Sequence, residues 1–162
     1  MKVAVVMGSL SDLSKVEPMV EILKNYNVEV LVKCLSAHRA HDKLIEFVKE
    51  AESFGVEVII AAAGMAAALP GVIAAMTTLP VIGVPIASKN LDGLDALLSI
   101  VQMPSGIPVA CVAIDGTKNA AYLSLEILGI KYSSIKEKLI EERKNMEKQA
   151  LQANEELQNK YK

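Results

Sequence analysis

A stretch near the start of the chain decides the fold: Val3-Ala-Val-Val-Met7, followed at once by Gly8-Ser-Leu-Ser-Asp12. The first part is continuously apolar and rich in β-branched residues. It lacks the alternation of a half-solvated strand, so it predicts a strand buried on both faces, as in a parallel sheet. Gly8 and the two serines then mark a turn that opens a helix. The stretch therefore predicts the first strand-to-helix unit of an α/β fold.

The same pattern recurs along the chain. Further strands are predicted at residues 28–35, 56–63, 80–85 and 108–114, and helices at 66–76, 91–101 and 119–128. Leu44, Phe47 and Val48 repeat at helical spacing and add an amphipathic helix after the second strand. We expect a three-layer, doubly wound, flavodoxin-like α/β fold, with a parallel sheet of about five strands and a long C-terminal helix.

Two expected helices contain residues that affect helix geometry. Val16, Val20 and Leu23 mark the apolar face of the first helix. Pro18 is expected to disturb its early turns, because proline lacks a backbone N–H. Gly129 follows the helix predicted at 119–128 and is a typical residue to end it.

Composition excludes several classes of protein. The 162 residues are 52% hydrophobic, 4% aromatic and 22% charged, with a formal net charge of -2. These values predict one soluble folded body rather than a disordered chain, and they give no general attraction to nucleic acid. The apolar runs break well before the roughly 18 residues that a membrane span needs. No secretory leader is visible, so we expect a cytoplasmic protein.

Charge is concentrated in the last part of the chain. Residues 131–162 carry 14 charged side chains in 32 positions, against 22 in the first 130 residues. An apolar stripe runs through this region at Ile135, Leu139, Met146, Ala150, Ala153 and Leu157. We expect an α/β catalytic domain at 1–130 and a helical extension at 131–162. The extension either lies on its own domain or packs on a neighbouring subunit, and the second is favoured because the body is already complete.

The two cysteines give no sign of a functional site. Cys34 and Cys111 each lie in an apolar, strand-like run, which predicts buried reduced thiols rather than a disulfide. No histidine partner stands near them, so they predict no metal site.

Candidate site residues follow the strands, because ligands of open parallel sheets bind where strand order reverses, at the carboxyl ends of the strands. After the first strand, the backbone N–H groups and the hydroxyls of Ser9 and Ser11 suit a phosphate, and Asp12 could accept hydrogen bonds from sugar hydroxyls. The same pattern also suits simple helix capping, by Ser11 or Asp12.

The second strand is followed by Ser36-Ala-His-Arg39. Arg39 is the only arginine before residue 130, and His38 and His41 are the only histidines of the chain. A histidine beside a lone arginine at a strand end fits a proton-transfer group next to an anion clamp. We predict a functional role for this pair and a solvent-facing, structural place for His41.

The third strand is followed by Ala61–Gly71, which is almost free of bulky side chains. Small residues let the backbone approach a ligand closely, and they also suit tight packing of a helix on a sheet. Together the three loops predict one pocket with phosphate-binding, acid/base and close-approach parts.

Six motifs in a fixed order carry a family resemblance. They are Gly8-Ser9-x-Ser11-Asp12, Ser36-Ala37-His38-Arg39, Leu69-Pro70-Gly71, Gly83-Val84-Pro85, Gln102-Met103-Pro104 with Gly106-Ile107-Pro108-Val109, and Asn119-Ala120-Ala121. Through them, residues 2–130 resemble the N5-carboxyaminoimidazole ribonucleotide mutases of purine biosynthesis, a family related to aminoimidazole ribonucleotide carboxylase.

The resemblance implies an enzyme that moves a carboxylate, by way of CO2, from the exocyclic nitrogen of the ribonucleotide to C4 of its imidazole, with no metal or cofactor. His38 would be the general acid/base, because one imidazole that titrates near neutrality can perform both proton transfers. The implied substrate-binding residues are Ser9, Ser11, Asp12, Ser36, Ala37, Arg39, Gly64, Ala66 and Leu69. The resemblance also implies a homo-octamer with sites at subunit interfaces and a C-terminal helix that reaches across neighbours.

Two departures from the family pattern leave alternatives. Ala68 stands where the mutase branch typically has a second histidine. The related branch, which carboxylates aminoimidazole ribonucleotide directly with CO2, lacks that histidine too. Residues 83–85 and 102–104 are of mutase type, so we expect a mutase, with direct carboxylation as the alternative. Residues 114–118 form a shorter and more polar loop than is usual in the family, which could alter how the site closes.

A non-catalytic, nucleotide-binding flavodoxin-like module is the alternative from another class. The chain has few aromatic residues with which to stack a flavin, which argues against that module.

Overall fold

Five parallel strands form the central sheet of the computed structural model, which describes residues 1–161. The strand order is β2-β1-β3-β4-β5. The strands are β1 (Lys2–Met7), β2 (Glu29–Cys34), β3 (Val58–Gly64), β4 (Val81–Ile86) and β5 (Ala110–Cys111). The predicted fold class is confirmed, and four of the five strands fall within two residues of their expected limits.

Six α-helices and one short 3-10 turn occur within residues 1–161. They are η1 (Leu10–Asp12), α1 (Leu13–Asn25), α2 (His41–Ala51), α3 (Leu69–Ala74), α4 (Leu94–Val101), α5 (Thr117–Lys131) and α6 (Ser133–Lys160). By its internal contacts the chain divides into a first unit, Met1–Ser124, and a second unit that begins at Leu125. The first unit contains the whole sheet.

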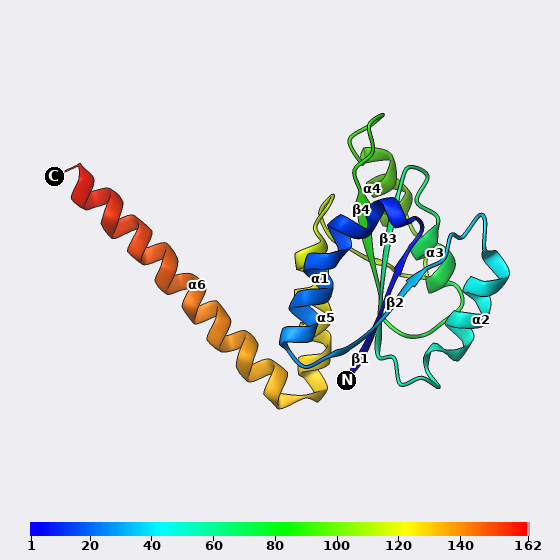
Figure 1. The fold of residues 1–162 in the computed structure, drawn as a ribbon, viewed down its shortest axis with the longest axis horizontal. Coiled ribbons are helices and arrows are strands. Elements are labelled where there is room, and N and C mark those ends of the chain that lie inside the picture. The colour runs from blue at the N-terminus through cyan, green and yellow to red at the C-terminus, as the bar shows by residue number, and fades with distance from the viewer. Residues whose placement is uncertain (162) are drawn as a thin grey trace. The chain divides into compact units, whose positions relative to one another are not determined.

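Helices cover both faces of the sheet, with α1 on one side and α2 and α3 on the other (Figure 1). Leu44 of α2, Ile73 of α3 and Ile100 of α4 are fully buried in one cluster with residues of β1 and β3. Burying each such side chain contributes about 1.5–3 kcal/mol, so this layer holds the sheet rigid beneath its loops. On the opposite face, α1 buries one helical stripe of its own.

The apolar stripe of α1 differs slightly from the prediction. Val16, Met19 and Leu23 are its buried residues, while Val20 is half-buried. The helix also runs unbroken through Pro18, which the sequence predicts to disturb it. Because Pro18 is the sixth residue of the helix, its missing N–H removes one hydrogen bond near the start, and the three buried side chains on the same helix still hold it to the sheet.

The last strand is shorter than the predicted 108–114. Pro108 has no N–H, and Pro85 of β4 turns its carbonyl toward this edge, where it accepts a hydrogen bond from Asp115 N at 2.8 Å. The N–H and C=O of a strand residue point to the same side, so the N–H that proline lacks would also face β5. Regular pairing between β4 and β5 is therefore limited to two residue pairs.

Two helix predictions also need correction. The helices predicted at 66–76 and 91–101 begin three residues later, at Leu69 and Leu94. Gly129 does not end α5, which continues to Lys131. At Gly129 an added Cβ would lie 3.6 Å from Lys136 Cα at the start of α6, so the glycine marks a close approach within the second unit.

Cys34 is exposed, which contradicts the predicted burial. It belongs to β2, an edge strand, and four of the strand's six residues are exposed. Cys111 is partly buried, and that burial raises the pKa of its thiol. Both cysteines are free thiols.

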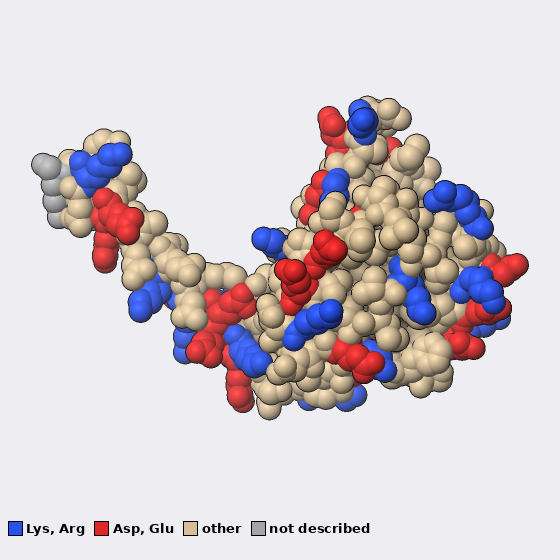
Figure 2. Space-filling model, in the orientation of Figure 1, with Lys and Arg blue, Asp and Glu red and all other residues tan. Residues whose placement is uncertain are grey.

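Charged side chains of both signs are mixed on one face of the molecule. Figure 2 shows Lys and Arg side chains interspersed with Asp and Glu over the visible face, without a large patch of one sign. No helix within residues 1–161 combines the length and the apolar character needed to cross a membrane.

We predict that Gly83→Ala destabilises the protein. A Cβ at this buried β4 position would lie 2.4 Å from Ile100 Cγ2 and 3.0 Å from Val109 Cγ1. Overpacking of this kind costs about 1–3 kcal/mol of the free energy of unfolding, which urea denaturation followed by circular dichroism measures. Gly8→Ala is the matched control, because an added Cβ there meets no atom within 4 Å. Equal stability of the two variants would contradict the tight packing at β4.

Candidate active site

A cleft of about 730 Å³ lies at the carboxyl ends of the strands, where the order reverses between β1 and β3. All ten residues predicted for the site line it: Ser9, Ser11, Asp12, Ser36, Ala37, His38, Arg39, Gly64, Ala66 and Leu69. The three predicted loops therefore meet in one place, although they are far apart in sequence. Their individual roles stay predictions.

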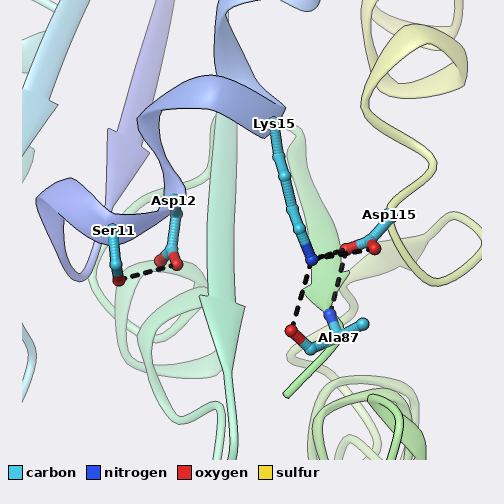
Figure 3. A network of polar contacts seen from close by, with 5 residues as sticks. All are labelled: Ser11, Asp12, Lys15, Ala87 and Asp115. Carbon is cyan, nitrogen blue, oxygen red and sulfur yellow. Dashed lines mark hydrogen bonds and ion pairs between the residues drawn. The ribbon is translucent and has the colours of Figure 1, made fainter. Parts of the chain in front are cut away.

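In the loop after β1, one residue caps the helix and another is left to bind a ligand. Ser9 is the N-cap of η1, and its Oγ accepts a hydrogen bond from Ser11 N at 3.3 Å. Asp12 precedes α1 but makes no side-chain capping bond; its Oδ1 contacts Ser11 Oγ at 3.1 Å (Figure 3). Ser9 is therefore the capping residue, in place of the expected Ser11 or Asp12, and the carboxylate of Asp12 keeps acceptor capacity for a ligand.

The loop after β2 is a tight turn that projects two functional side chains. Ala40 N and Arg39 N both donate to Ser36 O, at 2.9 and 3.3 Å. Arg39 reaches toward the first loop, with Nη2 at 3.4 Å from Gly8 O and Nε at 3.5 Å from Ser36 Oγ. Contacts this long are weak, so the exposed guanidinium remains free to bind an anion.

His38 is exposed and makes no side-chain hydrogen bond within residues 1–161. The imidazole is therefore available to a ligand in the cleft. His41 is the first residue of α2, is exposed, and is absent from the cleft lining, as predicted.

The third wall of the cleft, formed by residues 63–69, is apolar, and its small side chains leave the backbone near the cleft. At Gly64 an added Cβ would lie 3.1 Å from Ile86 O, so a larger residue would push β3 and β4 apart. Met65 follows with a φ of 58°, a left-handed conformation that costs a residue with a side chain about 1–3 kcal/mol. Ala67 and Leu69 are buried. This wall has no ionisable side chain, and Met65 and Ala66 are its exposed residues.

Sequence reasoning missed several residues of the cleft. Lys15, Met65, Ile86, Ala87 and Ser88 also line it. Lys15 Nζ lies 2.8 Å from Asp115 Oδ2 and 3.2 Å from Ala87 O (Figure 3). A partial signal existed for both charged residues: Lys15 stands three positions after Asp12, and Asp115 belongs to the loop noted as unusually polar.

The cleft has a mixed charge and no metal cluster. Arg39 and Lys15 are its cations, Asp12 is its carboxylate and His38 is its imidazole. Within the described part of the chain, no group of three or more His, Cys, Asp or Glu side chains is placed to hold a metal ion. The arrangement suits an anionic ligand with hydroxyl groups and a reaction that needs proton transfer.

Comparison with known proteins agrees with this geometry. The family model described as AIR carboxylase matches residues 2–149. The N5-carboxyaminoimidazole ribonucleotide mutase of Pyrococcus abyssi is 58% identical over 147 residues, which cover 91% of this chain and 84% of that protein. The enzyme of the same name from Methanocaldococcus jannaschii is 51% identical over 160 residues and 99% of each chain.

A solved structure extends the agreement to the fold. The crystal structure of Treponema denticola PurE superposes with a TM-score of 0.86 at 28% sequence identity, covering 93% of this chain and 94% of that one. The family model matches 148 of the 162 residues, well over half of the chain. The chain belongs to the AIR carboxylase family.

Proposed function

We propose that this protein is an N5-carboxyaminoimidazole ribonucleotide mutase of purine biosynthesis. It converts the N5-carboxylated ribonucleotide into its C4-carboxylated isomer. The observation that carries the proposal is the cleft that His38 and Arg39 line together with residues of the Ser9–Asp12 loop. An acid/base group, an anion clamp and hydroxyl-binding groups then surround one ligand.

His38 performs both proton transfers of the reaction. As an imidazolium it donates a proton to the exocyclic nitrogen; the N–C bond breaks, the nitrogen keeps the electron pair and CO2 is released. The electron-rich C4 then attacks CO2 to form the new C–C bond. The neutral imidazole removes the proton from C4, so protons and electrons balance over the cycle and no external acid, base or oxidant is consumed.

The remaining residues hold the ribonucleotide and the released CO2. Arg39 binds the phosphate, and Ser9, Ser11 and Asp12 bind the phosphate and ribose hydroxyls. Ser36 and Ala37 frame the ring against Gly64, Ala66 and Leu69 on the apolar wall. Small side chains there leave little water beside the reacting carbon, which favours recapture of CO2 over its escape.

Direct carboxylation of aminoimidazole ribonucleotide is the second candidate. Ala68 lines the cleft at the N-cap of α3, and its methyl group has no proton to transfer. His38 is thus the only histidine among the described residues that line the cleft. The balanced mutase cycle needs no second acid/base group, so this observation is compatible with the mutase.

The C-terminal region serves assembly in this proposal, and the protein acts in the cytoplasm as a homo-oligomer, with an octamer expected. The catalytic domain spans residues 1–130 and the extension residues 131–162. In α6, Met146 and Leu157 of the predicted stripe are each about half exposed, on a helix of 28 residues. An apolar stripe on a long helix needs a partner surface, and a second copy of the chain supplies one.

We expect purified protein to form the C4-carboxylated product from the N5-carboxylated ribonucleotide without ATP. His38→Asn should reduce kcat by roughly 10²–10⁴-fold, because it removes the acid/base group and leaves the cleft's shape. Product formation is followed by ultraviolet absorbance. A second reaction with aminoimidazole ribonucleotide and bicarbonate tests direct carboxylation.

The control for that variant is His41→Asn, which alters the other histidine outside the cleft and should keep near-normal turnover. Product from the bicarbonate reaction alone would make the protein a direct carboxylase. Near-normal activity of His38→Asn would remove this residue from the mechanism.

Arg39→Ala should weaken binding of aminoimidazole ribonucleotide by roughly tenfold to a hundredfold, the usual cost of losing a hydrogen bond to a charged group. Binding of the dephosphorylated nucleoside, measured by the same calorimetry, should hardly change. Equal losses for both ligands would place the phosphate elsewhere in the cleft.

A chain truncated after Lys144 should form a smaller assembly, as measured by light scattering. This end keeps the buried Ile135 and the ion pair between Arg143 and Glu126, so only the exposed part of α6 is lost. Full-length protein with Met146, Leu151 and Leu157 changed to serine is the matched variant, because it removes the large exposed apolar side chains beyond Lys144 and keeps the charges. An unchanged mass in both would show that α6 does not assemble the protein.

A further inference from the structure

One polar network joins three segments of the first unit at the side of the cleft (Figure 3). Lys15 Nζ of α1 lies 2.9 and 2.8 Å from the two carboxylate oxygens of Asp115, in the loop after β5. It also donates to Ala87 O, after β4, at 3.2 Å. Asp115 Oδ1 in turn accepts from Ala87 N at 2.9 Å. Both backbone groups of Ala87 are therefore held by this one ion pair.

The carboxylate of Asp115 is itself fixed by its backbone. Asp115 N donates to Pro85 O and Thr117 N donates to Asp115 O, each at 2.8 Å. Asp115 adopts a φ of 55°, and at the neighbouring Gly116 an added Cβ would lie 2.7 Å from Ala113 O. The tight turn therefore aims the carboxylate at Ala87 and leaves it little freedom.

Lys15 lines the cleft, yet it has no hydrogen left for a ligand. An ammonium group has three N–H donors, and its three acceptors here are the two oxygens of Asp115 and Ala87 O. A ligand-binding role would require breaking this pair. The geometry instead suits a residue that positions the cleft wall.

The wall it would position is Ala87-Ser88, which lines the cleft. Ser88 Oγ is buried and has no hydrogen-bond partner among residues 1–161. A buried unpaired hydroxyl is unfavourable, so a freely moving loop would relax to pair it. The loop keeps this conformation because other contacts fix its backbone, and the bonds to Ala87 are of that kind.

We propose that Lys15 and Asp115 are positioning residues that hold the Ala87-Ser88 wall in place for turnover without contacting the substrate. This inference rests on the proposed function for its kinetic part. The pair is about one-third exposed, at 35% and 38%, so it contributes little to global stability and its effect should be local.

The test uses the full-length variants Lys15→Met, Asp115→Asn and the double variant. Each single change should lower kcat by roughly tenfold to a hundredfold, as expected for a small misplacement of a site wall, with a smaller change in KM. The Tm should fall by no more than about 4 °C. The double variant should lose no more activity than the worse single variant, because both changes remove the same interaction.

A ligand-free measurement separates this inference from the proposed function. Hydrogen exchange of a peptide covering residues 85–90, followed by mass spectrometry, should be faster in all three variants than in the wild type. Lys15→Met removes the group that holds both the Asp115 carboxylate and Ala87 O, and Asp115→Asn replaces the charged acceptor of Ala87 N with a weaker amide oxygen. Lys43→Met is the matched control: it removes an exposed ion pair with Glu46 on α2, outside the cleft, and should change neither exchange nor kcat.

Each outcome tests either the positioning role or the proposed function. Unchanged exchange at residues 85–90 overturns the positioning role, whether or not the wild type is a mutase. Multiplicative losses in the double variant, or losses explained by unfolding alone, also overturn it. An inactive wild type refutes the proposed function, and hydrogen exchange then still decides whether the pair holds the wall.

Discussion

The candidate site depends on the pairing of β1 with two different neighbours. Val5 of this buried strand pairs with Val32 of β2 on one side and with Ile60 of β3 on the other. Because the chain passes from β1 to β2 and then crosses back to β3, the connections leave the sheet in opposite directions and open a crevice between them. Residues 8–12, 36–39 and 64–69 meet at this crevice. The topology therefore creates the cleft, and the loops supply the side chains that line it.

Close approach of backbone around the crevice imposes a second constraint. At Gly64, which lines the cleft, an added Cβ would lie 3.1 Å from the Ile86 carbonyl oxygen. Met65, directly after Gly64, takes a left-handed conformation in spite of its side chain. The chain must turn sharply there to carry the apolar wall from β3 into α3. Strain in this wall is tolerated because the buried layer beneath it is held by both neighbouring strands.

The sequence predicts what depends on local pattern and misses what depends on partners far along the chain. Continuous apolar runs predicted the parallel strands, and the scarcity of histidine and arginine predicted that His38 and Arg39 belong to the cleft. An apolar run does not reveal that β2 lies at the sheet edge, and so Cys34 was wrongly predicted to be buried. Lys15 resembles any surface lysine until the fold brings Asp115, 100 positions away, beside it.

Ala68 stands where the mutases typically have a second histidine, and the proposed reaction shows what its absence means. In the proposed reaction the nitrogen gains one proton and C4 loses one, so a single imidazole returns to its starting state after each turnover. A second histidine would then change how the ring is oriented or how CO2 is held, but it would add no required proton carrier. Ala68 lies at the N-cap of α3, and alanine and glycine line the cleft beside it. In the proposed reaction these small residues confine CO2 and take no part in proton transfer. In the proposed reaction His38 is the one proton carrier, and both reacting atoms must lie within reach of its imidazole. A cleft wall that keeps one position, as proposed for Ala87-Ser88, would help to hold them there.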